Sequence, residues 1–127
     1  MQFDRIRVSP PPTSIGDRVI DEAVLEELRE AVGAEVVSEL IETFVADVPG
    51  QISAIEAADS AESLGRAAHR LKGGSLSLGL IEVRELCVRL EEAGRGGRFA
   101  AVATDIGAVR GAVGRAVAAL KALLSTA

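Results

Sequence analysis

Residues 67–79 read AAHRLKGGSLSLG, and His69 within them is the only histidine of the chain. On an α-helix, at about 100° per residue, the apolar residues around it gather on one side. Within about 40° of the direction opposite His69 lie Leu64, Ala67, Leu71, Gly74 and Leu78, with Ala68 and Ser75 at one edge. The pattern predicts an amphipathic helix that buries this stripe and points His69 toward solvent.

Glycine flanks His69 on its own face of this helix. Gly65 stands one turn before the histidine and Gly73 one turn after it, so no side chain screens the imidazole along the helix axis. Glycine inside a helix lowers helix stability by roughly 1 kcal/mol relative to alanine. Two such glycines beside His69 therefore indicate that access to the imidazole matters. A neutral imidazole is a good nucleophile toward phosphorus, and Lys72 can pair with phosphoryl oxygens. The pattern therefore favours His69 as a phosphoryl acceptor.

The remaining residues of this face suggest a docking surface. Leu76 is apolar on the predicted solvent side, and Arg66 and Arg70 join Lys72 in a small basic zone of an acidic protein. Scattered surface leucines and ordinary surface charge are the alternative explanation. We predict that Gly65, Arg66, Arg70 and Leu76 contact a partner and that the arginines steer it electrostatically.

Helical spacing continues on both sides of this segment. We expect helices over residues 21–32, 34–58, 59–78, 80–93 and 98–124, with residues 94–97 as a loop. Asp21 can cap the first helix, and Asp59 with Glu62 forms a capping-box-like start for the His69 helix. Pro49 and Gly50 predict either a kink or a break in the second helix.

These segments predict one fold class. The sequence shows neither strand alternation nor an internal repeat, so we expect an all-α protein, an antiparallel four-helix bundle with a short extra N-terminal helix. The bundle should span residues 17–127. Residues 1–16 contain three consecutive prolines, Pro10 to Pro12, and are predicted to form an N-terminal tail.

Composition excludes several classes of function. The net charge of −5 and the sequence pI of about 4.9 argue against a nucleic-acid partner. No stretch approaches the ~20 apolar residues of a membrane span and no signal peptide is visible, so we expect a soluble, cytoplasmic protein. One cysteine, Cys87, and one histidine exclude an internal disulfide and a multi-histidine or cysteine metal cluster. We expect neither a metal nor a cofactor.

The chain resembles the histidine-containing phosphotransfer (HPt) family. The family signature is His-x-x-Lys-Gly-x-Ser-x-x-Leu-Gly, and its fixed positions are filled here by His69, Lys72, Gly73, Ser75, Leu78 and Gly79. Leu80 stands where the family usually has alanine. The runs Phe44-x-x-x-x-Pro49 and Cys87-x-x-Leu90-Glu91-x-x-Gly94-Arg95 also resemble the flanking segments of the family, so the similarity covers roughly residues 16–124.

This resemblance implies a phosphocarrier of a two-component multistep phosphorelay. A phosphoryl group would pass between His69 and aspartates of response-regulator receiver domains, with a sensor or hybrid histidine kinase as a further partner. By the same analogy Lys72 stabilises the phosphate and Gly73 keeps the approach open. The magnesium of the transfer would belong to the receiver. The chain should have no kinase activity of its own, since it has no Walker-type loop and no kinase catalytic-loop pattern.

Two other functions stay open at this point. The chain could be an interaction module that docks receivers without carrying phosphate, or the histidine-bearing domain of a larger chemotaxis-type kinase. The presence of His69 with Lys72 and Gly73 favours the phosphocarrier over the interaction module. A start at Met1 and an end soon after the last predicted helix favour a free-standing protein, and a monomer is the simplest expectation.

Overall fold

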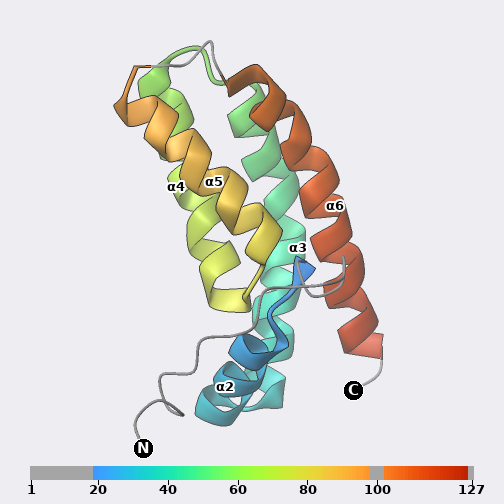
Figure 1. Ribbon diagram of the computed structural model, residues 1–127. Coiled ribbons are helices and arrows are strands. Elements are labelled where there is room, and N and C mark those ends of the chain that lie inside the picture. Colours follow the sequence, from blue (N-terminus) through green and yellow to red (C-terminus); the bar gives the residue numbers. More distant parts are fainter. Residues whose placement is uncertain (1–18, 98–101, 126–127) are drawn as a thin grey trace, which may run out of the picture.

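The computed structural model describes residues 19–97 and 102–125, and these form five helices without a strand (Figure 1). Their bounds are α2 (Glu22–Val32), α3 (Ala34–Glu56), α4 (Ala61–Leu78), α5 (Ile81–Arg95) and α6 (Ala103–Ser125). Helices α3 to α6 run side by side with alternating direction, and α2 lies at one end of α3. The all-α four-helix bundle with a short N-terminal helix is confirmed. The tail predicted over residues 1–16 and the start of the last predicted helix lie outside the described residues.

An aliphatic core fills the centre of the bundle. Its completely buried side chains include Ile55, Leu64, Leu71, Leu90 and Leu120, which come from four different helices. Burying a side chain of this size contributes roughly 1.5–3 kcal/mol relative to leaving it in water. The bundle is therefore held together mainly by leucine, isoleucine and valine contacts, and it gives α4 a rigid base.

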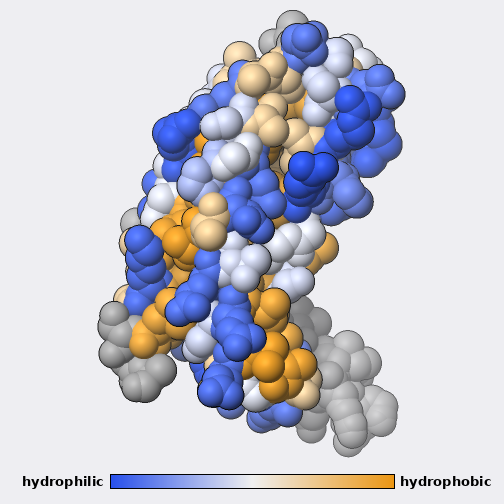
Figure 2. All heavy atoms as spheres, turned by 180° about the vertical axis from the view of Figure 1, so that it is seen from behind, coloured by the Kyte–Doolittle hydropathy of each residue, from blue (hydrophilic) through white to orange (hydrophobic). Residues whose placement is uncertain are grey.

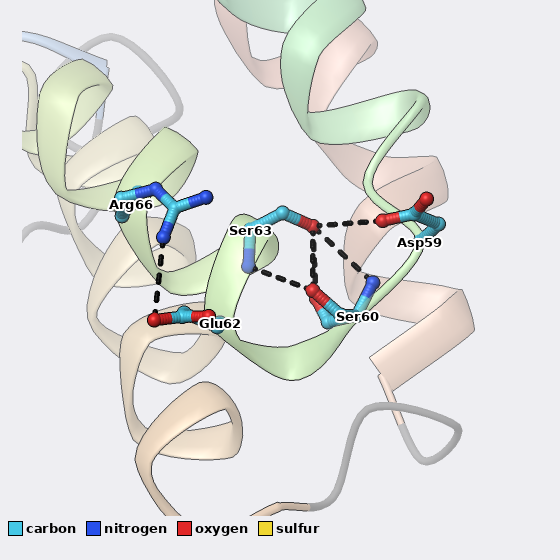
Figure 3. Close-up of polar contacts among 5 residues, drawn as sticks. All are labelled: Asp59, Ser60, Glu62, Ser63 and Arg66. Atoms are coloured by element: carbon cyan, nitrogen blue, oxygen red, sulfur yellow. Dashed lines mark hydrogen bonds and ion pairs between the residues drawn. The ribbon is translucent and has the colours of Figure 1, made fainter.

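The N-cap of helix α4 is Ser60, one residue later than the predicted Asp59. The Ser60 hydroxyl accepts the Ser63 backbone N–H at 3.0 Å, and the Ser63 hydroxyl accepts the Ser60 N–H at 3.2 Å, which closes a reciprocal capping box (Figure 3). The box predicted from Asp59 and Glu62 is wrong, because serine at the third helical position takes the part that glutamate usually plays. Glu62 instead pairs with Arg66 at 3.4 Å.

Helix α3 continues through Pro49, so a break at this point is wrong. The buried side chains Phe44, Val48, Ile52 and Ile55 follow helical spacing on both sides of the proline. Proline removes one backbone hydrogen bond and strains the preceding turn. Core packing along one face outweighs this local cost.

The opposite end of α4 is fixed by Gly79. This residue has a left-handed φ of 71°, and an added Cβ would lie 2.9 Å from the Asp21 carbonyl oxygen. The Asp21 N–H donates to the Gly79 carbonyl at 2.8 Å, and the Asp21 carboxylate caps α2 by accepting the Ala23 N–H. The predicted cap at Asp21 and helix end at Gly79 are both confirmed. Together they hold α2 against the end of α4.

Helix α5 extends two residues further than predicted, so Gly94 and Arg95 belong to the helix and not to a loop. An added Cβ at Gly94 would lie 2.8 Å from the Ala61 carbonyl oxygen and 3.2 Å from the Gly65 Cα. The glycine therefore lets the backbones of α4 and α5 touch at the end of the bundle. This close contact shapes the surface beside His69.

Helix α6 is joined to its neighbours by exposed ion pairs as well as by apolar contacts. Arg110 donates two hydrogen bonds to Glu56 of α3, at 2.7 and 3.1 Å, and Arg115 binds Glu82 of α5 in the same way. The hydrogen bond from Arg110 lowers the pKa of Glu56. Because both arginine side chains are at least half exposed, these pairs contribute little to stability.

Candidate functional site

His69 lies near the middle of α4 with 72% of its side chain exposed. The predicted solvent orientation is confirmed, and Leu64, Leu71 and Leu78 are buried on the opposite side. The buried stripe is turned slightly from the prediction. Ala68 and Ser75, expected at its edge, are fully buried, whereas Ala67 and Gly74, expected at its centre, are partly exposed.

Glu91 of α5 fixes the orientation of the imidazole. The His69 Nδ1 lies 2.7 Å from Glu91 Oε2, and the Glu91 side chain is only 11% exposed. An ionised carboxylate can only accept hydrogen bonds, so the geometry assigns the ring proton of a neutral His69 to Nδ1. In that tautomer Nε2 keeps its lone pair, and this is the nitrogen that Glu91 does not hold.

Lys72 also binds Glu91. Its Nζ lies 2.5 Å from Glu91 Oε1, and its side chain is 25% exposed. The carboxylate thus receives one donor on each oxygen, His69 on one and Lys72 on the other. The sequence predicted that the Lys72 charge would be available to phosphoryl oxygens. In this structure its ammonium group is occupied by Glu91, one turn along α4 from the imidazole.

The charge state of this cluster follows from its contacts. Burial raises the pKa of Glu91, but the hydrogen bonds from Lys72 and His69 outweigh it, and the net pKa is lowered. Glu91 therefore stays ionised at neutral pH. Cys87, one turn earlier on α5, is fully buried, and burial together with the Glu91 charge raises its pKa to about 12. Its thiol remains protonated and packs as a small apolar group.

The two glycines that flank His69 have open space around them. An added Cβ at Gly65 or at Gly73 would meet nothing within 4 Å. Packing therefore does not require glycine at either position. Their absent side chains leave the ring accessible along α4, which is the role that the sequence suggested for Gly73.

A groove of ≈ 910 Å³ runs along α4 and α5 next to His69. Its walls include the predicted residues Gly65, Arg66 and Arg70, and Arg95 joins them from α5. Leu76 lies elsewhere. It is 50% exposed and borders a smaller hollow of ≈ 270 Å³ beside Asp21 and Val24. The structure thus divides the predicted docking residues between two surfaces.

Apolar side chains also reach the surface away from the groove. Besides Leu76, the large exposed ones are Val32, Val36 and Leu40 of α2 and α3. In the view of Figure 2, hydrophobic residues are most visible in the lower half, the end of the bundle that carries α2. Val32, Val36 and Leu40 do not line the groove beside His69.

Sequence reasoning missed Glu91 and Arg95 as site residues. Glu91 appeared only within a flanking segment of the resemblance, although it is in register with Val83, Cys87 and Leu90 on the buried face of its helix. A charged residue on an otherwise apolar stripe was the signal that could have identified it. Arg95 was assigned to a loop, so its place beside the groove was not predictable.

Among residues 19–97 and 102–125, no group of three or more His, Cys, Asp or Glu side chains is placed to hold a metal ion. Within the same ranges, no helix is both long enough and apolar enough to cross a membrane.

Comparison with known proteins identifies the family of the chain. The family model of the Hpt domain matches residues 39–125, more than half of the 127 residues, and includes the whole His69–Lys72–Glu91 cluster. No curated protein and no solved structure matched. The helical bundle agrees with the family match. The chain belongs to the Hpt domain family, whose members act in histidine phosphotransfer of two-component signalling.

Proposed function

We propose that this protein is a phosphocarrier of a multistep phosphorelay and that His69 Nε2 accepts and returns the phosphoryl group. The observation that carries the proposal is the pairing of His69 Nδ1 with the buried carboxylate of Glu91. This hydrogen bond leaves the other ring nitrogen, on an exposed side chain, with a free lone pair. The chain carries the phosphoryl group without a kinase activity of its own, in the cytoplasm.

The transfer follows from the arrangement of the ring. His69 Nε2 attacks the phosphorus of a receiver aspartyl phosphate, so that an N–P bond forms as the acyl O–P bond breaks and the aspartate carboxylate leaves. The imidazole gains positive charge in this step. Glu91, which already accepts the Nδ1 proton, stabilises that charge in the way a carboxylate supports a catalytic histidine. Return of the phosphoryl group reverses each step.

Lys72 and Gly73 assist this step in different ways. Lys72 neutralises Glu91 in the resting protein, and its flexible side chain, one turn along α4 from His69, can turn to phosphoryl oxygens once they arrive. Gly73 has open space where a side chain would stand. A bulky donor can therefore approach the ring in line.

The test is phosphoryl transfer from a panel of phosphorylated receiver domains. We expect acid-labile, base-stable phosphate on the parent chain and none on His69→Gln. Because His69 is the only histidine, the phosphorylated nitrogen can be assigned directly by ¹⁵N and ³¹P NMR, and we expect Nε2.

Other results would select other functions. Label that persists in His69→Gln would exclude His69 as the acceptor. Label from a histidine kinase alone, with no receiver active in either direction, would favour the histidine-bearing domain of a larger kinase. A folded protein that binds receivers and takes no label would be an interaction module.

A further inference from the structure

The end of the bundle that carries α2 is strongly acidic. Residues 22–56, which span α2 and α3, contain nine acidic side chains and a single basic one, Arg29. The rest of the chain contains ten acidic residues and thirteen lysines and arginines, so the negative net charge is concentrated on these two helices. Arg29 is itself paired with Glu26 at 2.6 Å. Apart from Glu26 and Glu56, the carboxylates of α2 and α3 are exposed and have no ion pair with another residue that the structure describes.

Exposed apolar side chains lie at this same end. Among the described residues four large apolar side chains are exposed, and three of them belong to α2 and α3. Val32 is the last residue of α2, and Val36 and Leu40 stand one turn apart near the start of α3. Their exposed fractions are 44%, 40% and 40%. We call these three residues the α2–α3 strip.

A row of carboxylates runs along one side of the α2–α3 strip. Glu35, Glu39 and Glu42 follow one another at intervals of four and three residues, so they share one face of α3. Like charges at this spacing repel one another and weaken a helix. Helix α3 contains no lysine or arginine that could offset this repulsion. The stability of α3 therefore does not explain the acidic row.

We propose that the α2–α3 strip is the docking site of a basic amphipathic helix of a partner protein. Apolar side chains of that helix, repeated every three to four residues, cover Val36 and Leu40 as one helix packs against another. Lysines and arginines beside them pair with Glu35, Glu39 and Glu42. The inference goes beyond the proposed function and does not depend on phosphoryl transfer.

The charge of this end argues against other occupants. A second copy of the chain would bring the same acidic row against itself, and an anionic membrane surface would also be repelled. A receiver that carries an aspartyl phosphate presents carboxylates and phosphoryl oxygens, so it is negatively charged as well. A basic helix is the occupant that matches both the charge and the apolar spacing.

The α2–α3 strip lies apart from His69 along the bundle. The Phe44 ring of α3 is opposite Gly74 of α4, where an added Cβ would lie 3.1 Å from it. Leu40 precedes Phe44 by four residues and His69 precedes Gly74 by five, and the two helices run in opposite directions (Figure 1). At 1.5 Å per residue, the strip and the imidazole are separated by roughly 14 Å along the bundle. The partner helix can therefore stay bound while His69 remains accessible.

The experiment uses a synthetic peptide as the probe. Its leucines repeat at helical spacing with lysines beside them, and a second peptide keeps the leucines but carries glutamates in place of the lysines. Fluorescence anisotropy measures the dissociation constant of each peptide with the full chain, and ¹⁵N amide shifts of the protein locate the contact. We expect only the basic peptide to bind, more weakly at high salt, with shifts in α2 and the start of α3.

Two variants change the strip and its acidic row. Leu40→Ser removes an apolar contact, and Glu39→Lys reverses a charge, both at exposed positions. Matched controls make the same changes at exposed positions elsewhere, with Leu76→Ser on α4 and Glu92→Lys on α5. We expect the dissociation constant to rise by about tenfold or more in the two strip variants. It should stay within about twofold of the parent value in the controls.

Four results would overturn the proposal. No binding at about 1 mM basic peptide would show that the strip is not a docking site. Equal binding of the two peptides, or equal dissociation constants in strip variants and controls, would show that neither the charge nor the strip is recognised. Shifts confined to the surface beside His69 would place the basic helix there instead. Self-association of the protein that Leu40→Ser abolishes, measured by sedimentation, would make a second copy the occupant.

Discussion

At the scale of single residues, Glu91 decides which ring nitrogen of His69 is free. Replacing it by glutamine removes the charge and offers an NH₂ group that can donate to Nδ1, which favours the tautomer with the proton on Nε2. We expect Glu91→Gln to slow phosphoryl transfer on the order of 10²-fold. The ¹⁵N shifts of the single imidazole should show the change of tautomer. Glu92→Gln, on the exposed neighbour, is the control, and equal tautomers and rates in both variants would contradict this role.

The same carboxylate predicts how stability depends on pH. Its folded pKa lies below the ordinary value of 4.5, so the unfolded chain binds the proton more tightly than the folded one. The contribution of Glu91 to stability is therefore complete above pH 4.5 and is lost as the pH falls through the folded pKa. Urea unfolding at a series of pH values should show the parent and Glu91→Gln converging in acid. A constant difference in unfolding free energy between the two proteins at all pH values would show that the lowered pKa of Glu91 does not contribute to stability.

At the scale of helices, Gly73 within α4 and Gly79 directly after it predict opposite effects of a glycine-to-alanine substitution. Gly73 has helical backbone and open space, so Gly73→Ala should raise the free energy of unfolding by about 0.5–1 kcal/mol. Gly79 has a φ of +71°, and an added Cβ would lie 2.9 Å from the Asp21 carbonyl oxygen. Gly79→Ala should therefore destabilise the protein, by about 1 kcal/mol or more. Equilibrium unfolding in urea measures both, and the same sign for both would refute the argument.

The signature motif can be understood element by element. Leu78 is buried in the core, and Gly79 ends the helix. The fully buried Ser75 hydroxyl donates a hydrogen bond to the Leu71 carbonyl at 2.9 Å. These parts were predictable because their causes are local to α4. The N-cap was placed one residue early, at Asp59 instead of Ser60, since two serines can close a capping box as well as the expected acidic pair.

At the scale of the whole molecule, the aliphatic core should dominate stability over the surface ion pairs. Leu71 is fully buried beneath the His69 face, and Leu71→Ala should cost about 2–5 kcal/mol. Arg110 forms two hydrogen bonds to Glu56, but its side chain is 65% exposed. Arg110→Ala should cost less than about 1 kcal/mol. Chemical denaturation of the parent and the two variants measures the loss of unfolding free energy in each. A larger loss in Arg110→Ala than in Leu71→Ala would contradict the prediction.

The sequence predicted the architecture better than it predicted the site. Periodic leucines and valines, with Asp21 and Gly79 at helix ends, were enough to place the bundle. The contact of His69 with Glu91 depends on the register between α4 and α5, 22 residues apart in the chain. That register is set by packing details such as the close approach at Gly94. Periodicity within one helix carries no information about it.

The burial of Cys87 makes its thiol a probe of local opening of α5. The thiol is the only one in the chain, and its raised pKa leaves almost no thiolate at neutral pH. A thiol-alkylating reagent can therefore label the protein only when α5 opens and exposes this side chain. Because Cys87 lies one turn from Glu91, the alkylation rate would measure how often the support behind the imidazole comes apart, and whether a phosphoryl group on His69 slows that opening.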